Sequence, residues 1–403
     1  MGRIRPVKAT LIGAGGLLLA VGAFMNAMGS VLASAGSPMA VAFDSRNADA
    51  LAQRATEQVT AAQTDDRKLE TLRRTANRAL AAGPIQASAM RSVAIATAME
   101  GDPGAALRQL TLAERMSRRD YGTQLALIQA CVAASDVPCA LRHYDLALST
   151  TPWDEMLTAK LITALAMPEV RQGLAGYFHA GRPWTESFLA RVANKSPDPT
   201  DVADMLVRAR GLPGTPLNHE SESIILARLA AAGEWEALRR FYDSLAGPGA
   251  ASALDLSFSP ALTEPRRQPV AWRTVRTGLV NASFEPRNGG GLQLRTTAAA
   301  GEQGVAASKL SFLPPGRYSL ITKVASGGTL PARWRLRCVA GAAPPIGEQP
   351  ILAEHPNIFD FSIPAGCPAQ LLELLAGDPD GDGESQLLIT GIILNRAKGD
   401  LRS

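Results

Sequence analysis

The apolar positions of the chain follow three different patterns, one after another along the sequence. The first covers residues 9–35, which carry no charge and are apolar or small almost throughout, directly after the basic residues Arg3, Arg5 and Lys8. A helix needs about 20 such residues to cross the hydrocarbon core of a membrane. Positive charge in the short segment before such a helix keeps that segment in the cytoplasm. The pattern therefore predicts a cytoplasmic tail over 1–8 and a transmembrane signal anchor over 9–35.

A cleaved signal peptide is the alternative for the same segment. Ala33, Ser34 and Ala35 fit the small-x-small pattern of a cleavage site. The apolar core of a signal peptide runs about 7–15 residues, however, and this apolar stretch is longer. We favour a retained, single-pass anchor in a bacterial inner membrane. Both interpretations export the rest of the chain, so we expect its bulk in the periplasm.

The second pattern is helical and extends over residues 36–246. Ala/Leu/Arg-rich segments are broken there by Gly, Pro and Asp. A period is visible, because Ala79, Ala113 and Ala147 recur at intervals of 34 residues, and the segment 101–107 aligns with 135–141 at the same interval. Small residues at such positions let neighbouring helices approach closely, while Leu110 and Tyr144 would fill the space beside them.

A 34-residue period with two helices per unit resembles the tetratricopeptide repeat, most specifically over about 65–152. The resemblance implies a solenoid of helical hairpins whose concave surface binds a partner segment. The inner positions include Arg91, Ile95, Leu125 and Gln129, which we take as candidate partner-binding residues. They do not form the Lys/Asn clamp that grips a carboxylate. A solenoid that only packs on its own C-terminal domain is the alternative.

The third pattern alternates, as expected of an all-β sandwich over residues 269–397, after a linker over 247–268 and before a tail over 398–403. In the segment 332–338, Trp334 and Cys338 share one face, and Arg333, Arg335 and Arg337 share the other. The predicted fold class is thus multidomain: a transmembrane helix, an all-α repeat solenoid, then a jelly-roll-like sandwich.

The sandwich also resembles jelly-roll carbohydrate-binding modules. The segment 313–320 (LPPGRYSL) looks like the strand entry common in that group, and the segment 389–394 (ITGIIL) resembles its closing strand. Such modules stack sugars on exposed aromatic rings, whereas four aromatic residues of this sandwich point inward by their alternation: Tyr318, Trp334, Phe359 and Phe361. Trp272 stays open as a glycan-binding ring. The stripe Arg333/Arg335/Arg337 is an anion-binding surface for glycan or phosphate, a solvated sheet face, or a face that packs against acidic groups of a neighbouring domain.

The four cysteines fall into one pair in each half of the chain. In an oxidising compartment, this arrangement predicts the disulfides Cys131–Cys139 and Cys338–Cys367. Neither pair has the spacing of a zinc site.

An acidic turn is the remaining candidate for a ligand site. Asp378, Asp380 and Asp382 match the start of a calcium-binding loop, but the twelfth position is Ile389 instead of a bidentate Glu. Either the loop binds a structural Ca²⁺ ion, or it simply connects two strands. We expect no other cofactor.

Composition excludes some functions and leaves others open. The 403 residues carry a net charge of +4 and no dense basic run, so we expect no nucleic-acid partner. The four histidines (His143, His179, His219 and His355) lie in no nucleophile or metal motif, and no phosphate-binding loop is present.

The sequence therefore predicts a non-catalytic scaffold. Membrane-anchored repeat proteins of this kind resemble accessory proteins of exopolysaccharide or cell-envelope assembly, which implies a protein partner for the solenoid. The alternative is a periplasmic glycan-binding protein that acts through the sandwich. An enzyme acting on surface polysaccharide is a third class, for which no motif argues.

Overall fold

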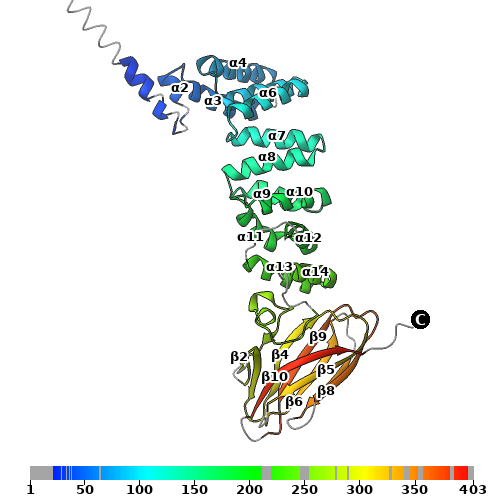
Figure 1. Cartoon of the computed structure of the whole chain (residues 1–403). Helices are drawn as coiled ribbons and strands as arrows, with labels where there is room; N and C mark the ends of the chain where they lie inside the picture. The colour runs from blue at the N-terminus through cyan, green and yellow to red at the C-terminus, as the bar shows by residue number, and fades with distance from the viewer. Residues whose placement is uncertain are drawn as a thin grey trace, which may run out of the picture. The chain divides into compact units, whose positions relative to one another are not determined.

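The computed structural model describes residues 21–28, 30–32, 34–35, 37, 39–62, 65–210, 219–245, 254–276, 279–287, 290–325, 329–339, 345–352, 357–381 and 385–397 (Figure 1). The chain forms two compact units, Met1–Leu157 and Thr158–Ser403. The change from helices to strands falls inside the second unit, between α14 and β1.

The predicted membrane anchor lies only partly within the described residues. Residues 1–20 are outside them, together with Ala33 of the candidate cleavage site, and residues 21–28 are helical. Among the helices that the structure describes, none combines the length and the apolar character that a membrane crossing requires.

The first unit is helical. Its elements are α2 (Ala40–Phe43), α3 (Ala48–Ala62), α4 (Asp66–Ala82), α5 (Ala87–Met99), α6 (Pro103–Met116), α7 (Tyr121–Ala133) and α8 (Val137–Thr150), and α9 (Glu155–Ala164) begins at its end. Consecutive helices pack as antiparallel pairs, α3 with α4, α5 with α6 and α7 with α8. The repeated alanines Ala79, Ala113 and Ala147 are each 0% exposed at these contacts, as their spacing predicts.

The same turn closes the hairpins α5/α6 and α7/α8. The second residue after the first helix has a left-handed backbone, with φ of 93° at Gly101 and 56° at Ser135. The next residue, Asp102 or Asp136, caps the second helix by accepting a backbone N–H three residues later, at 2.8 and 3.0 Å. Because both features recur after 34 residues, the backbone carries the period seen in the sequence.

The second unit begins with further helices. They are α10 (Pro168–His179), α11 (Thr185–Lys195), α12 (Pro199–Arg210), α13 (His219–Ala232) and α14 (Trp235–Leu245), followed by the 3-10 helices η1 (Pro260–Leu262) and η2 (Pro265–Arg267). The turn between α13 and α14 repeats the left-handed residue, with φ of 74° at Gly233. A helical hairpin of the same construction thus recurs at the end of the helical region.

Two antiparallel five-stranded sheets form the predicted sandwich. One sheet has the order β1 (Arg273–Thr274), β4 (Gln303–Ser311), β9 (Gln370–Gly377), β6 (Ala332–Cys338) and β7 (Gly347–Ile351). The other has the order β2 (Val280–Pro286), β3 (Leu292–Ala298), β10 (Ser385–Arg396), β5 (Gly316–Val324) and β8 (Asn357–Ile363).

The core of the sandwich lies between the sheets, where the alternating apolar residues point. Trp334 of β6 is 1% exposed, and its Nε1 donates to Thr322 Oγ1 of β5 at 2.8 Å, which joins the two sheets. The described part of the predicted linker also belongs to this packing, because Leu256, Phe258 and Leu262 are buried. That stretch is therefore folded against the sandwich.

Both predicted disulfides are present. Cys131–Cys139 ties the end of α7 to the start of α8 with a Cα–Cα distance of 5.7 Å, and Cys338–Cys367 ties β6 to the loop after β8 at 5.6 Å. Both separations lie within the usual range for the bond.

A lysine lies inside the sandwich, and no carboxylate of the described residues forms an ion pair with it. Lys309 of β4 is 0% exposed, and its Nζ donates to the Val270 carbonyl at 2.7 Å. Burial lowers the pKa of Lys309 to about 7, against the opposing charge of Asp255. The fold thus favours the neutral amine at this position.

We predict that Lys309→Met stabilises the protein at pH 7 and that this gain shrinks by pH 10. An unfolded lysine titrates near pH 10.4, so between about pH 7 and 10 the unfolded chain binds the extra proton and the folded protein gains stability as the pH rises. Equilibrium denaturation at both pH values measures the difference. The exposed Lys323→Met is the control, and equal effects of Lys309→Met at the two pH values would contradict the prediction.

Candidate functional site

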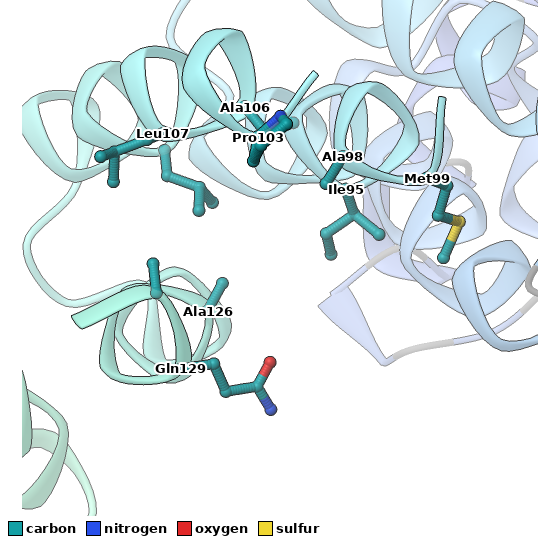
Figure 2. A pocket seen from close by; sticks show the side chains of 11 residues that line it. Ile95, Ala98, Met99, Pro103, Ala106, Leu107, Ala126 and Gln129 are labelled. Atoms are coloured by element: carbon teal, nitrogen blue, oxygen red, sulfur yellow. The ribbon is translucent and has the colours of Figure 1, made fainter. Parts of the chain in front are cut away.

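An apolar groove opens between α5, α6 and α7 in the first unit (Figure 2). Its volume is about 490 Å³. The lining residues are Ala94, Ile95, Ala98 and Met99 of α5, Pro103, Ala106, Leu107 and Leu110 of α6, and Ala126, Gln129 and Ala130 of α7. In Figure 2 the side chains of α5 and α6 lie across the space from Ala126 and Gln129 of α7.

The groove exists because the two hairpins pack more closely within themselves than against each other. α5 packs along α6 and α7 packs along α8, while the contacts of α7 with α5 and α6 are fewer. Five of the lining side chains are small, because Ala94, Ala98, Ala106, Ala126 and Ala130 are all alanines, and such side chains leave space between the helices unfilled. Leu107 is 46% exposed on its wall. The result is an apolar surface that solvent reaches.

Two of the four predicted partner-binding residues line this groove. Ile95 and Gln129 do so, whereas the half-buried Leu125 is not among the lining residues. Arg91 is 8% exposed and points elsewhere: its guanidinium donates to the Asp120 carboxylate and, at 3.1 Å, to Thr56 Oγ1. The prediction of Arg91 as a partner-binding residue is therefore corrected, because its guanidinium is buried and paired with the Asp120 carboxylate.

Arg91 fixes the start of α7 against α5. Asp120 is the N-cap of α7 and accepts the backbone N–H of Thr123 at 2.8 Å and its hydroxyl at 2.5 Å. The same carboxylate accepts the Arg91 guanidinium, so one side chain caps the helix and binds its neighbour. Since α5 and α7 form opposite walls of the groove, this ion pair joins the two walls.

Gly122 makes room for this arrangement. A Cβ added at Gly122 would lie 2.5 Å from Arg91 Cζ, which is closer than real side chains approach. The guanidinium cannot withdraw without leaving Asp120 and Thr56. The glycine in the first turn of α7 is thus explained by packing against Arg91.

We predict that Gly122→Ala destabilises the protein by about 1–3 kcal/mol, because a buried hydrogen-bonded charge loses its partner. Helix propensity alone would make Gly122→Ala stabilising, by up to about 1 kcal/mol in the free energy of unfolding. Urea denaturation measures the change.

Gly176→Ala in α10 is the matched control, because a Cβ there meets nothing within 4 Å. It is expected to stabilise the protein slightly. If Gly122→Ala were as favourable as Gly176→Ala, the role given to Arg91 would be wrong.

A second polar network lies behind the groove, where α6, α7 and α8 meet. His143 is 1% exposed, with Nδ1 2.7 Å from Gln124 Oε1 and Nε2 2.9 Å from Arg142 Nη2. Arg142 also pairs with Glu114 of α6 at 3.1 Å. Burial and the charge of Arg142 lower the pKa of His143. The network was not predicted, because it joins residues of α6, α7 and α8, and the sequence does not show which side chains of these helices face one another.

The arginine stripe of the sandwich is engaged by acidic neighbours. Arg335 and Arg337 both pair with Glu373 of β9, at 2.8 and 3.3 Å, and Arg333 pairs with Glu348 of β7 at 3.2 Å. These acidic groups belong to the same sheet as the stripe and not to a neighbouring domain, and the contacts favour a paired sheet face over an anion-binding surface.

The aromatic side chains of the sandwich are directed inward. Tyr318, Phe359 and Phe361 are at most 8% exposed, as predicted. Trp272, which was left open for a glycan, is only 1% exposed and packs against Phe258 and Trp334. The candidate role of Trp272 in glycan binding is therefore corrected.

The acidic loop after β9 is described only in part. Asp378 Oδ1 accepts the Asp380 backbone N–H at 3.0 Å, which closes the turn. Asp382 lies outside the described residues, as does His355. A Ca²⁺ site at Asp378 and Asp380 stays a prediction.

Known proteins offer only distant similarity to this chain. No protein-family model matches the chain, and no curated protein matches it. Among solved structures, the accessory secretory proteins 1, 2 and 3 of Streptococcus pneumoniae are similar with a TM-score of 0.22 and 11% identity, over 31% of this chain and 90% of that chain. The carbohydrate-binding module TmCBM61, in complex with β-1,4-galactotriose, is similar with a TM-score of 0.22 and 13% identity, over 32% of this chain and 90% of that chain. Similarity at this level carries no functional argument, which must rest on the residues of this chain.

Proposed function

We propose that this protein is a non-catalytic scaffold that binds an amphipathic helix of a partner protein in the groove between α5, α6 and α7. The observation that carries the proposal is the groove itself, an accessible space of about 490 Å³ with a lining of apolar and small side chains. Burial of apolar surface is the main driving force for association at such a site.

The lining favours a helix over an extended peptide. Gln129 is the one polar side chain among the lining residues. An extended segment would therefore bury backbone N–H and C=O groups without partners, at a cost of about 1–3 kcal/mol for each unpaired group. A helix satisfies its own backbone and presents only side chains to the groove. The partner should thus offer apolar residues at the spacing i, i+3 or i+4 and i+7.

The proposed location follows from the leader and the disulfides. The uncharged stretch 9–35 after three basic residues supports a single-pass anchor, with the bulk of the chain on the periplasmic side. The two disulfides support an oxidising compartment. A tetratricopeptide-like array on an anchor suits exopolysaccharide or cell-envelope assembly, where a scaffold holds partners at the membrane.

The sandwich is proposed to be a docking module for protein. None of the described aromatic side chains from residue 254 onward is exposed, so these residues offer no ring on which a sugar can stack. This observation disfavours the glycan-binding alternative.

We predict that a photo-cross-linking amino acid at position 98 captures a partner protein in cells, whereas the same amino acid at position 133 does not. Ala98 and Ala133 are both exposed in the last turn of a helix, but only Ala98 lines the groove. Introducing Ile95→Glu should remove the adduct, because a carboxylate would be buried in an apolar contact. Gel electrophoresis of the cross-linked chain measures both.

Equal capture at the two positions, or an adduct that survives Ile95→Glu, would contradict binding in the groove. Circular dichroism of the Ile95→Glu variant confirms that the helices remain folded, so a loss of capture can be assigned to the groove.

Cell fractionation tests the proposed location separately. The intact chain is expected with the inner membrane, extractable by detergent and not by salt, with its thiols inaccessible to alkylation before reduction. Recovery of the chain in the soluble cytosol with four reactive thiols would refute the location and leave the groove hypothesis standing.

A further inference from the structure

A cluster of two sulfurs and one imidazole lies where α7 meets α8. The ligand atoms of Cys131, Cys139 and His143 are all within 4.8 Å of one another. Cys131 lies in the last turn of α7, Cys139 lies in the first turn of α8, and His143 follows one turn later on the same side of that helix. The hairpin turn thus brings three potential ligands to one point.

We propose that, once the Cys131–Cys139 disulfide is reduced, the two thiolates and the imidazole of His143 bind one Zn²⁺ ion. Zinc prefers Cys sulfur and His nitrogen in tetrahedral sites, and three protein ligands leave its fourth position to water. This inference concerns the cross-link of the hairpin and goes beyond the proposed scaffold function.

The surroundings of His143 suit a metal ligand. Its Nδ1–H donates to Gln124 Oε1 at 2.7 Å, since a carbonyl oxygen can only accept. This contact orients the ring in the way that second-sphere groups orient metal-bound histidines. The lone pair then lies on Nε2, which now accepts from Arg142 Nη2 at 2.9 Å.

Arg142 can release the ring when a metal binds. Its side chain is 57% exposed and also holds Glu114 through Nη1 at 3.1 Å. Two thiolates would neutralise the charge of Zn²⁺, and Glu114 already balances Arg142. The site therefore adds no net charge to the interior of the hairpin.

The chemistry balances with an external dithiol as reductant. The dithiol transfers two electrons, its own disulfide forms, and the Cys131–Cys139 bond breaks to give two thiols. Binding of Zn²⁺ then displaces the two thiol protons to solvent. Either cross-link, covalent or metal-mediated, joins α7 to α8, and α7 is a wall of the groove.

Cobalt titration of the reduced full chain tests the proposal, with Zn²⁺ displacement as the second step. Co²⁺ bound by thiolates gives near-ultraviolet charge-transfer bands. The wild type is expected to bind one more Co²⁺ than Cys131→Ser/Cys139→Ser, and Zn²⁺ should abolish the bands. Cys338 and Cys367 are present in every sample, so they contribute the same background.

His143→Gln should weaken Co²⁺ binding by more than about tenfold, the lower end of the loss seen when even a second-sphere group is removed. His179→Gln in α10 is the matched control and should bind like the wild type. The oxidised wild type should give no bands.

Three results would overturn the proposal: equal binding by the wild type and the double serine variant, undiminished binding by His143→Gln, or equal binding by the oxidised chain. If the double serine variant fails to fold, as judged by circular dichroism, the comparison of His143→Gln with His179→Gln decides alone.

Discussion

The closed hairpin turn is the constraint on which the helical region depends. After α5, α7 and α13 the chain enters the left-handed region at Gly101, Ser135 and Gly233, and the backbone then reverses into the next helix. The N–H of the following residue donates to the carbonyl of the residue five positions earlier, as from Asp136 to Cys131 at 2.9 Å. This turn makes the two helices antiparallel neighbours, so that the small residues between them can meet.

The hairpins α5/α6 and α7/α8 pack more extensively within themselves than against each other, and Leu110 and Leu127 supply part of the contact between them. Arg91 and Asp120 join α5 to α7, and Arg142 with Glu114 joins α8 to α6. These polar contacts fix neighbouring hairpins without filling the space between them. An apolar groove at the junction is the consequence, and the proposed function is a consequence of the groove.

The sequence was sufficient for whatever depends on local pattern. The 34-residue period, the alternating strands and both disulfides follow from residue spacing, and the structure agrees with each of them.

The partners of individual side chains were not predictable from residue spacing. Arg335 meets Glu373 only because β6 and β9 pair in one register, and Arg91 meets Asp120 across two helices. Trp272 is buried because Phe258 folds back from a segment that composition assigns to a linker. Of the candidate site, Ile95 and Gln129 were predicted from the helical face on which they lie. Ala98 and Leu107 were missed, because the sequence does not show where neighbouring helices leave space between them.

The central claim is that the groove accepts one face of a helix. Mass spectrometry of the peptide cross-linked to position 98 tests it most directly, because it reads the sequence of the occupant. The account predicts a segment with apolar residues at the spacing i, i+3 or i+4 and i+7, and with polar residues between them. A strictly alternating or uniformly acidic segment, or a cross-link to glycan, would contradict it.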